Sequence, residues 1–90
     1  MSTIEVEVRN AVGLHARPAS LFVKLAASYP CAVLARNVTA NSNRANAKSI
    51  LSVMTLGVKQ GDILEIQADG PQANEALEAL ARLVREDLAE

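Results

Sequence analysis

The sequence predicts an α+β fold, an open-faced sandwich in which a four-stranded antiparallel sheet carries three helices on one face. Three observations lead to this prediction. Strand-like and helix-like segments follow one another in the order β-α-β-β-α-β-α, the strand-like runs are too short to close a barrel, and each helical segment has a single apolar stripe. A helix with one apolar stripe is buried on one side only, so all three helices can pack on one sheet face.

The composition indicates one domain that spans residues 1–90. Half of the 90 residues are apolar, which is enough for a core without a metal or a disulfide. The single cysteine, Cys31, has apolar neighbours and is expected to be a small buried hydrophobe. With one Phe, one Tyr, no Trp and a formal net charge of −1, the chain shows no sign of a nucleic-acid or membrane-binding surface. It also has no basic-then-apolar leader and no apolar run of about 20 residues, so a cytoplasmic protein is expected.

The first half of the chain contains three predicted strands and one helix. Alternation of apolar and polar residues predicts a strand over Thr3–Val8, and turn residues follow at Asn10–Gly13. Helical spacing covers Pro18–Ser28, and strands are predicted over Cys31–Val38 and, more weakly, Arg44–Ala47, with a turn at 41–43 between them. The positions expected to face inward are Ile4, Val6, Val8, Ala19, Phe22, Val23, Ala26, Val33 and Ala35.

The second half contains two predicted helices and one strand. A short helix is expected over Ser49–Gly57, because Ser49 is a good N-cap and Gly57 a natural stop. After a turn at Gln60–Asp62, an alternating strand follows, and Gln72–Leu88 gives the strongest helical pattern of the chain. The expected inward positions here are Leu64, Ile66 and Ala68 of the strand, and Ala73, Ala76, Leu77, Leu80, Leu83 and Val84 of the helix.

The only histidine, His15, lies where the first turn meets the first helix, in Gly13-Leu14-His15-Ala16-Arg17-Pro18-Ala19-Ser20. Unpaired amides and the helix dipole make this position attractive to an anion, and Arg17 adds a guanidinium that can hold phosphate oxygens. A neutral imidazole nitrogen is a nucleophile near physiological pH. From these residues alone, a surface or capping histidine is as good an interpretation as a nucleophile. A metal site is disfavoured because no second His or Cys lies at ligand spacing.

Two segments resemble the signatures of one family. Residues 13–19 (GLHARPA) look like the active-site signature of HPr, the histidine-containing phosphocarrier of the bacterial phosphotransferase system, and residues 48–57 (KSILSVMTLG) resemble that family's second signature, around a regulatory serine. The order of elements also matches, so the resemblance spans nearly the whole chain. One departure is a span between the two signatures that is about three residues longer than usual, placed at Thr39–Asn46, and its effect would fall on partner choice rather than on the fold.

The resemblance implies a phosphoryl relay carried out by a non-enzymatic protein without a cofactor. Enzyme I, charged by phosphoenolpyruvate, would phosphorylate Nδ1 of His15, and the group would pass to the EIIA domain of a sugar permease. Arg17 would be the electrostatic partner of the phosphoryl group, and the backbone N–H groups of Ala16 and Arg17 its helix-terminus donors. A monomer is expected.

Ser49 has a structural and a regulatory interpretation. The structural one is the N-cap of the second helix, which typically contributes about 1 kcal/mol. The regulatory one, implied by the resemblance, is phosphorylation by the HPr kinase/phosphorylase that accompanies some family members, which would add negative charge near His15 and repel an acidic partner.

A docking surface is predicted around His15. The first and second helices hold more large apolar residues than one buried stripe each requires, and basic residues border them. An apolar patch with a basic rim is suited to partners with acidic rims and to salt-sensitive association. The residues of this docking surface are Leu21, Lys24, Leu25, Lys48, Ile50, Leu51 and Met54.

Other functions are compatible with parts of the pattern. A carrier in the nitrogen-related or dihydroxyacetone branch of the phosphotransferase system would share the histidine motif. A small-ligand regulatory domain of similar build would need a closed apolar pocket and neither His15 nor Arg17. A purely regulatory relative acting through Ser49 would lack the active-site histidine, which is present here.

Overall fold

The computed structural model describes residues 2–87 and has one sheet and three helices. The elements are β1 (Ser2–Glu7), α1 (Ala16–Ala27), β2 (Ala32–Asn37), β3 (Ala45–Asn46), α2 (Ile50–Met54), β4 (Ile63–Asp69) and α3 (Ala73–Arg82), which continues into a π-helical turn (Leu83–Asp87).

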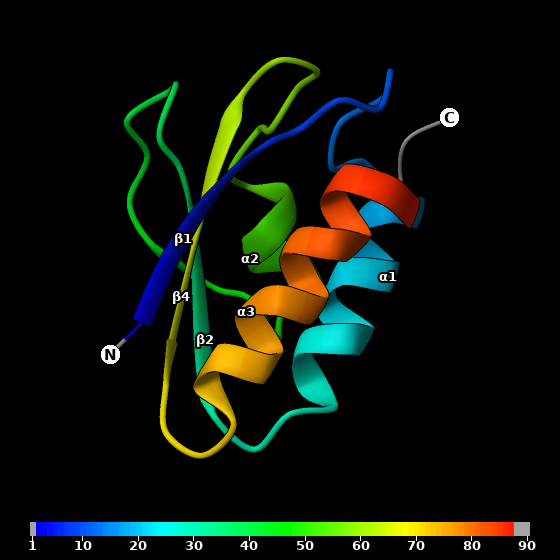
Figure 1. Ribbon diagram of the computed structural model, residues 1–90. Coiled ribbons are helices and arrows are strands. Elements are labelled where there is room, and N and C mark those ends of the chain that lie inside the picture. Colours follow the sequence, from blue (N-terminus) through cyan, green and yellow to red (C-terminus); the bar gives the residue numbers. More distant parts are fainter. Residues whose placement is uncertain (1, 88–90) are drawn as a thin grey trace.

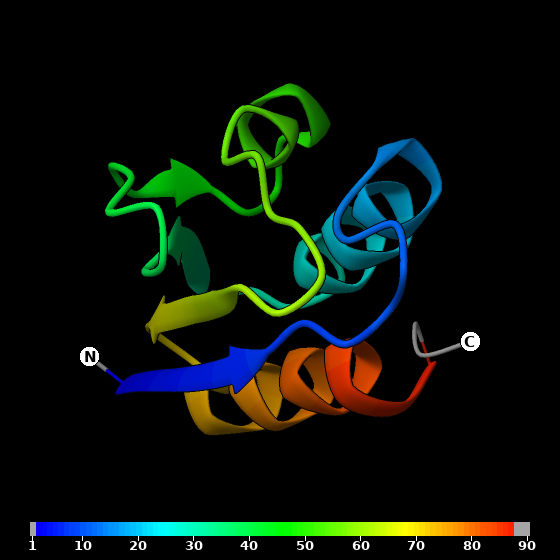
Figure 2. The same ribbon diagram turned by 90° about the horizontal axis from the view of Figure 1, so that it is seen from above.

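The sheet is antiparallel throughout, with the strand order β1-β4-β2-β3. The last strand in the chain, β4, is central: it pairs with β1 in the register Val6↔Leu64 and with β2 in the register Ala35↔Ile66. All three helices lie on one face of this sheet, as the two views in Figures 1 and 2 show, and the other face is left open. The predicted fold class and order of elements are therefore confirmed.

The core lies between the sheet and the helices and is almost entirely aliphatic. The alternating residues of β2 and β4 that were predicted to face inward, Val33, Ala35, Leu64, Ile66 and Ala68, are all buried. From α1, the predicted residues Ala19, Phe22 and Ala26 are buried, whereas Val23 is half-buried. Burial of Cys31 confirms that it is a small core residue. Because the described helices and strands share one core, the start of α1, where His15 lies, rests on a rigid base.

Several predicted boundaries differ from the observed ones. The helix α1 begins at Ala16, two residues before the predicted start at Pro18, because the N–H of Ala19 already donates to the carbonyl of His15 at 2.8 Å. The prediction overrated Pro18 as a boundary, since a proline is tolerated anywhere in the first turn. The helix α2 ends at Met54, three residues before the predicted stop, and Gly57 lies in the loop that follows it, with a φ of +61°. The predicted final residue of α3, Leu88, lies outside the described residues.

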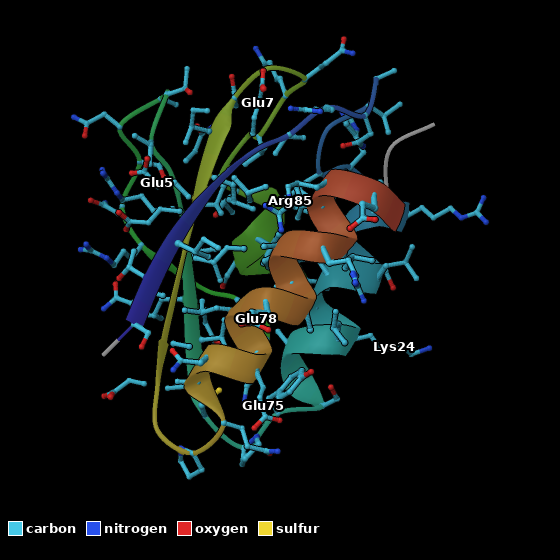
Figure 3. The ribbon with its side chains drawn as sticks, in the orientation of Figure 1. Glu5, Glu7, Lys24, Glu75, Glu78 and Arg85 are labelled. Atoms are coloured by element: carbon cyan, nitrogen blue, oxygen red, sulfur yellow. The ribbon has the colours of Figure 1, made fainter. Side chains whose placement is uncertain are left out.

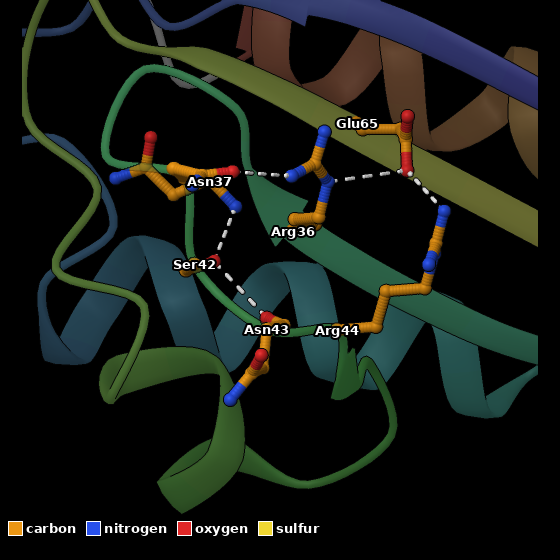
Figure 4. Close-up of polar contacts among 7 residues, drawn as sticks. Arg36, Asn37, Ser42, Asn43, Arg44 and Glu65 are labelled. Atoms are coloured by element: carbon orange, nitrogen blue, oxygen red, sulfur yellow. Dashed lines mark hydrogen bonds and ion pairs between the residues drawn. The ribbon is translucent and has the colours of Figure 1, made fainter.

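Side chains organise the segment between β2 and β3, where the longer loop was predicted. Arg36 and Arg44 both approach Glu65 on the open face of the sheet, with N···O distances of 3.7 and 3.5 Å (Figure 4). The hydroxyl of Ser42 accepts from the N–H of Asn37 at 2.9 Å and donates to the carbonyl of Asn43 at 3.0 Å. The third strand is Ala45–Asn46, shorter than the Arg44–Ala47 that was predicted, although the N–H of Ala47 still donates to the carbonyl of Val33 at 2.9 Å.

Candidate functional site

His15 is the N-cap residue of α1. Its backbone is extended (φ −77°, ψ −173°), and its side chain makes no capping hydrogen bond. The side chain is exposed. The imidazole therefore sits at the start of a helix without being committed to stabilising it, so its nitrogens are accessible to a reactant.

The first turn of α1 leaves a small number of backbone donors at the position of His15. An α-helix has no internal partners for its first N–H groups, and in α1 the first amide to bond within the helix is that of Ala19. Pro18 carries no N–H, so the unpaired helical amides are those of Ala16 and Arg17, the two predicted from the resemblance. The first turn contains no acidic residue, so nothing in it offsets the positive end of the helix dipole.

The loop that carries His15 is held by close backbone contacts. Gly13 has a φ of +61°, and a Cβ at this position would collide with the carbonyl oxygen of Val58. Leu14 donates its N–H to that same oxygen at 3.2 Å, and its side chain is buried. Asn10 closes the turn by donating from Nδ2 to the carbonyl of Gly13 at 2.7 Å. His15 is thus presented from a loop that is anchored on both sides.

A shallow pocket of about 160 Å³ opens beside His15. The residues that line it come from the histidine loop, from the end of α2 and from the loop after it, and they are Leu14, His15, Met54, Gly57, Val58 and Lys59. Most of this lining is apolar. The polar side chains that an anion could meet there are those of His15 and Lys59.

Arg17 lies in the first turn of α1 and is exposed. Within the part of the chain that the structure describes, no acidic side chain forms an ion pair with it. Its guanidinium is therefore available to an incoming anion instead of being neutralised by the protein itself.

Ser49 is the N-cap of α2, which confirms its structural interpretation. Its hydroxyl accepts a hydrogen bond from the N–H of Ser52 at 3.4 Å. The preceding residue, Lys48, donates from Nζ to the carbonyl of Tyr29 at 2.8 Å. The start of α2 is thereby tied to the end of α1, and the two helices contact one another.

The structure divides the predicted docking surface into exposed and partly buried members. Leu21, Ile50, Leu51 and Met54 are exposed, and Leu51 is the most exposed of them at 76%. Lys24 extends from α1 into solvent (Figure 3). Leu25 and Lys48 are half-buried. Leu25 packs against the edge of the core, and the amine of Lys48 donates to the carbonyl of Tyr29.

Two residues near His15 were missed by the sequence reasoning. Val12 is 55% exposed in the turn before the histidine, and Lys59 lines the pocket from the loop after α2. A β-branched apolar residue inside a turn is unusual and was a usable signal for Val12. No local pattern could have placed Lys59 beside His15, because the contact depends on the packing of two distant loops.

Comparisons with known proteins agree with this geometry. Residues 2–86 match the family model described as the PTS HPr component phosphorylation site. The chain is 42% identical over 80 residues to the phosphocarrier protein HPr of Vibrio cholerae, covering 89% of this chain and 91% of that protein. It is 40% identical over 85 residues to the corresponding protein of Pseudomonas aeruginosa, covering 93% and 91%.

Solved structures give the same result. The crystal structure of HPr-C-His from Thermoanaerobacter tengcongensis superimposes with a TM-score of 0.91 at 37% identity, covering 100% of this chain and 98% of that one. HPr from Bacillus anthracis superimposes with a TM-score of 0.86 at 37% identity, covering 93% and 96%. Among the described residues, none of the helices has the length and apolar character needed to cross a membrane.

The fold and the family match define a small relay protein that carries phosphoryl groups between other proteins and is not itself an enzyme. The chain belongs to the HPr family of the phosphotransferase system and functions as an HPr phosphocarrier. Its partners are accordingly other components of that relay.

Proposed function

We propose that His15 is the residue that carries the phosphoryl group, on Nδ1. The observation that supports this most directly is an exposed imidazole at the N-cap of α1 that makes no capping hydrogen bond. It is also the only histidine of the chain, and the pocket of about 160 Å³ opens next to it. A capping histidine would be expected to use its ring as a hydrogen-bond acceptor for the first turn, and this one does not.

The chemistry follows from the groups around the ring. Nδ1 of the neutral imidazole attacks phosphorus, and the bond between phosphorus and the donor breaks as the P–N bond forms. The charge on the phosphoryl oxygens is met by the N–H groups of Ala16 and Arg17 and by the Arg17 guanidinium. Because the P–N bond stays reactive, the group is passed on when an acceptor nucleophile attacks the same phosphorus.

The proposed relay runs from Enzyme I to the EIIA domains of sugar permeases, in the cytoplasm, with this chain acting as a monomeric single domain. The exposed apolar residues of α1 and α2 support the docking surface, with Lys24 at its rim. We add Val12 to this surface, because it is exposed in the histidine loop. Leu25 and Lys48 contribute less to it, since each is partly engaged within the protein.

Regulation at Ser49 by an HPr kinase/phosphorylase is a second proposal. It is supported by the contact between α1 and α2, which brings a modification at the start of α2 to the docking surface. A phosphate there would add negative charge where an acidic partner is expected to bind, and so would weaken docking.

The proposed acceptor is tested with phosphoenolpyruvate and a bacterial Enzyme I, followed by intact-mass measurement. We expect a gain of one phosphoryl group, about 80 Da, that is stable in base and lost in acid. His15→Ala should gain nothing, and a protein that is still phosphorylated after this substitution would refute the assignment. Transfer onward to EIIA domains of the sugar and nitrogen branches then shows which branch the chain serves.

Arg17→Ala tests the proposed electrostatic partner. The variant should keep its thermal unfolding midpoint, because removing one exposed charge rarely affects stability. It should accept the phosphoryl group more slowly than the unsubstituted protein. An unchanged rate would show that Arg17 does not hold the phosphoryl group.

A further inference from the structure

The pocket beside His15 contains a second ionisable group. His15 and Lys59 are the only residues of its lining that can carry charge, and the other four are apolar side chains or glycine. At about 160 Å³, the pocket is far larger than the roughly 15 Å³ that admits one water molecule. An anion attached to His15 can therefore enter a space that is shared with a lysine.

The backbone of Lys59 is fixed relative to the histidine loop. The N–H of Leu14 donates to the carbonyl of Val58, and a Cβ at Gly13 would lie 2.9 Å from the Cα of Lys59. On the other side, the N–H of Lys59 donates to Oδ2 of Asp62 at 3.0 Å. The position of Lys59 beside His15 is therefore set by direct backbone contact and by an anchored turn.

The side chain of Lys59 is exposed. Among the described side chains, none forms an ion pair with Lys59. Oδ2 of Asp62 accepts from two other donors, the N–H of Lys59 and Nδ2 of Asn37, each at 3.0 Å. The ammonium group is free to turn toward an anion in the pocket.

We propose that Lys59 is a second cation for the phosphoryl group on His15, acting from the loop after α2 while Arg17 acts from α1. The inference rests on the proposed role of His15. Lys59 transfers neither a proton nor electrons: as the donor–phosphorus bond breaks and the P–N bond forms, it supplies positive charge to the phosphoryl oxygens. Arg17 is not part of the pocket lining, so the two cations approach from different elements and are not redundant.

The test compares the rate of phosphorylation by Enzyme I in Lys59→Met, Lys59→Arg and a matched control, Arg44→Met. The control also removes one positive charge from a loop, but Arg44 lies on the open face of the sheet with Glu65. We expect a roughly two- to fivefold loss of rate in Lys59→Met, with Lys59→Arg and the control near the unsubstituted value. The loss should shrink at high ionic strength, because salt screens the interaction of exposed charges.

A second readout does not depend on Enzyme I docking. In the isolated phosphoprotein, the ³¹P resonance should move in Lys59→Met and stay unchanged in Arg44→Met, because Arg44 lies away from the pocket. A resonance and a rate that are both unchanged in Lys59→Met overturn the inference. If the unsubstituted protein instead takes up no phosphoryl group on His15, the proposed function itself is wrong, so the two failures are distinguishable.

Discussion

The side-chain amide of Asn37 donates to the carboxylate of Asp62 at 3.0 Å, from a position that is wholly buried at the end of β2. The same amide donates to the carbonyl of Leu56 at 3.1 Å, and its oxygen accepts from the N–H of Ala40 at 3.2 Å. One side chain thus joins the turn after β2, the end of α2 and the turn that leads into β4. Because Asp62 also holds the N–H of Lys59, this network supports the loop that faces His15.

Asn37→Leu is expected to lower the free energy of unfolding by about 2–3 kcal/mol, because it leaves buried polar groups without partners. Urea denaturation measures the change. Asn43→Ala is the matched control: Asn43 is exposed in the same loop, and its loss should change stability by less than about 0.5 kcal/mol. Equal effects of the two substitutions would contradict the importance of the buried network.

Gly13 and Gly57 form a natural pair for comparison, because both have a φ of +61°. A Cβ at Gly57 has nothing within 4 Å, so Gly57→Ala should cost only the left-handed backbone strain, about 1 kcal/mol. Gly13→Ala adds a collision with the carbonyl of Val58 and should cost about 2–4 kcal/mol in total.

The rate of phosphorylation by Enzyme I should also differ between Gly13→Ala and Gly57→Ala. Gly13→Ala should slow phosphorylation more than Gly57→Ala does, because in Gly13→Ala the histidine loop has to move away from Val58. If Gly13→Ala is no more destabilising than Gly57→Ala, the two loops are not in the close contact described.

Ser49→Ala removes the acceptor that caps α2. The hydrogen bond to Ser52 is long, so the expected loss is at the lower end of capping values, about 0.5–1 kcal/mol of unfolding free energy. Ser49→Asp keeps a capping acceptor and should restore stability. It should also slow phosphorylation by roughly two- to fivefold through repulsion of an acidic partner, whereas Asn43→Asp, with the same change in charge, should not. A Ser49→Asp protein with unchanged transfer would argue against regulation at this position.

Substitutions of Leu51 and Val53, both in α2, distinguish an effect on docking from an effect on stability. Leu51 is 76% exposed and Val53 is fully buried. Leu51→Ala should leave the unfolding free energy within about 0.5 kcal/mol but weaken binding to an EIIA domain by about five- to tenfold, as measured by calorimetric titration. Val53→Ala should do the reverse, with a stability loss of about 2 kcal/mol and unchanged affinity. Normal affinity in Leu51→Ala would place the docking surface elsewhere.

The sequence was sufficient to predict the fold class because each element buries one face. The spacing of apolar residues that indicates this face lies within the element's own sequence. The alternation of Leu64, Ile66 and Ala68 predicted a strand here, although it did not predict that this strand is central in the sheet. The position of His15 between a turn and a helix was also predictable, but the residues alone left its role open, and the predicted phosphoryl acceptor came from the family resemblance. Boundaries were less accessible: α1 starts before Pro18 because a backbone hydrogen bond to His15, and not the proline, determines its first turn.

Features that depend on tertiary packing could not be read from the sequence. The amine of Lys48 is held by Tyr29, so it borders the predicted docking surface less freely than a surface lysine would. In the sequence, Asn37 resembles an ordinary turn residue. Its side chain is buried and hydrogen-bonded to three segments only because those segments meet in the folded protein. Lys59 lies beside His15 for the same reason.

The hydrogen bond between Leu14 and Val58 has a consequence for the stage of folding at which the site around His15 is formed. The histidine loop is synthesised early, but the backbone that holds it belongs to the second half of the chain, as does β4, the strand with which β1 pairs. A chain that has not yet formed these contacts therefore lacks the surroundings in which His15 is proposed to act. On the proposed role of His15, a chain in which these two halves have not yet paired is expected to accept the phosphoryl group poorly.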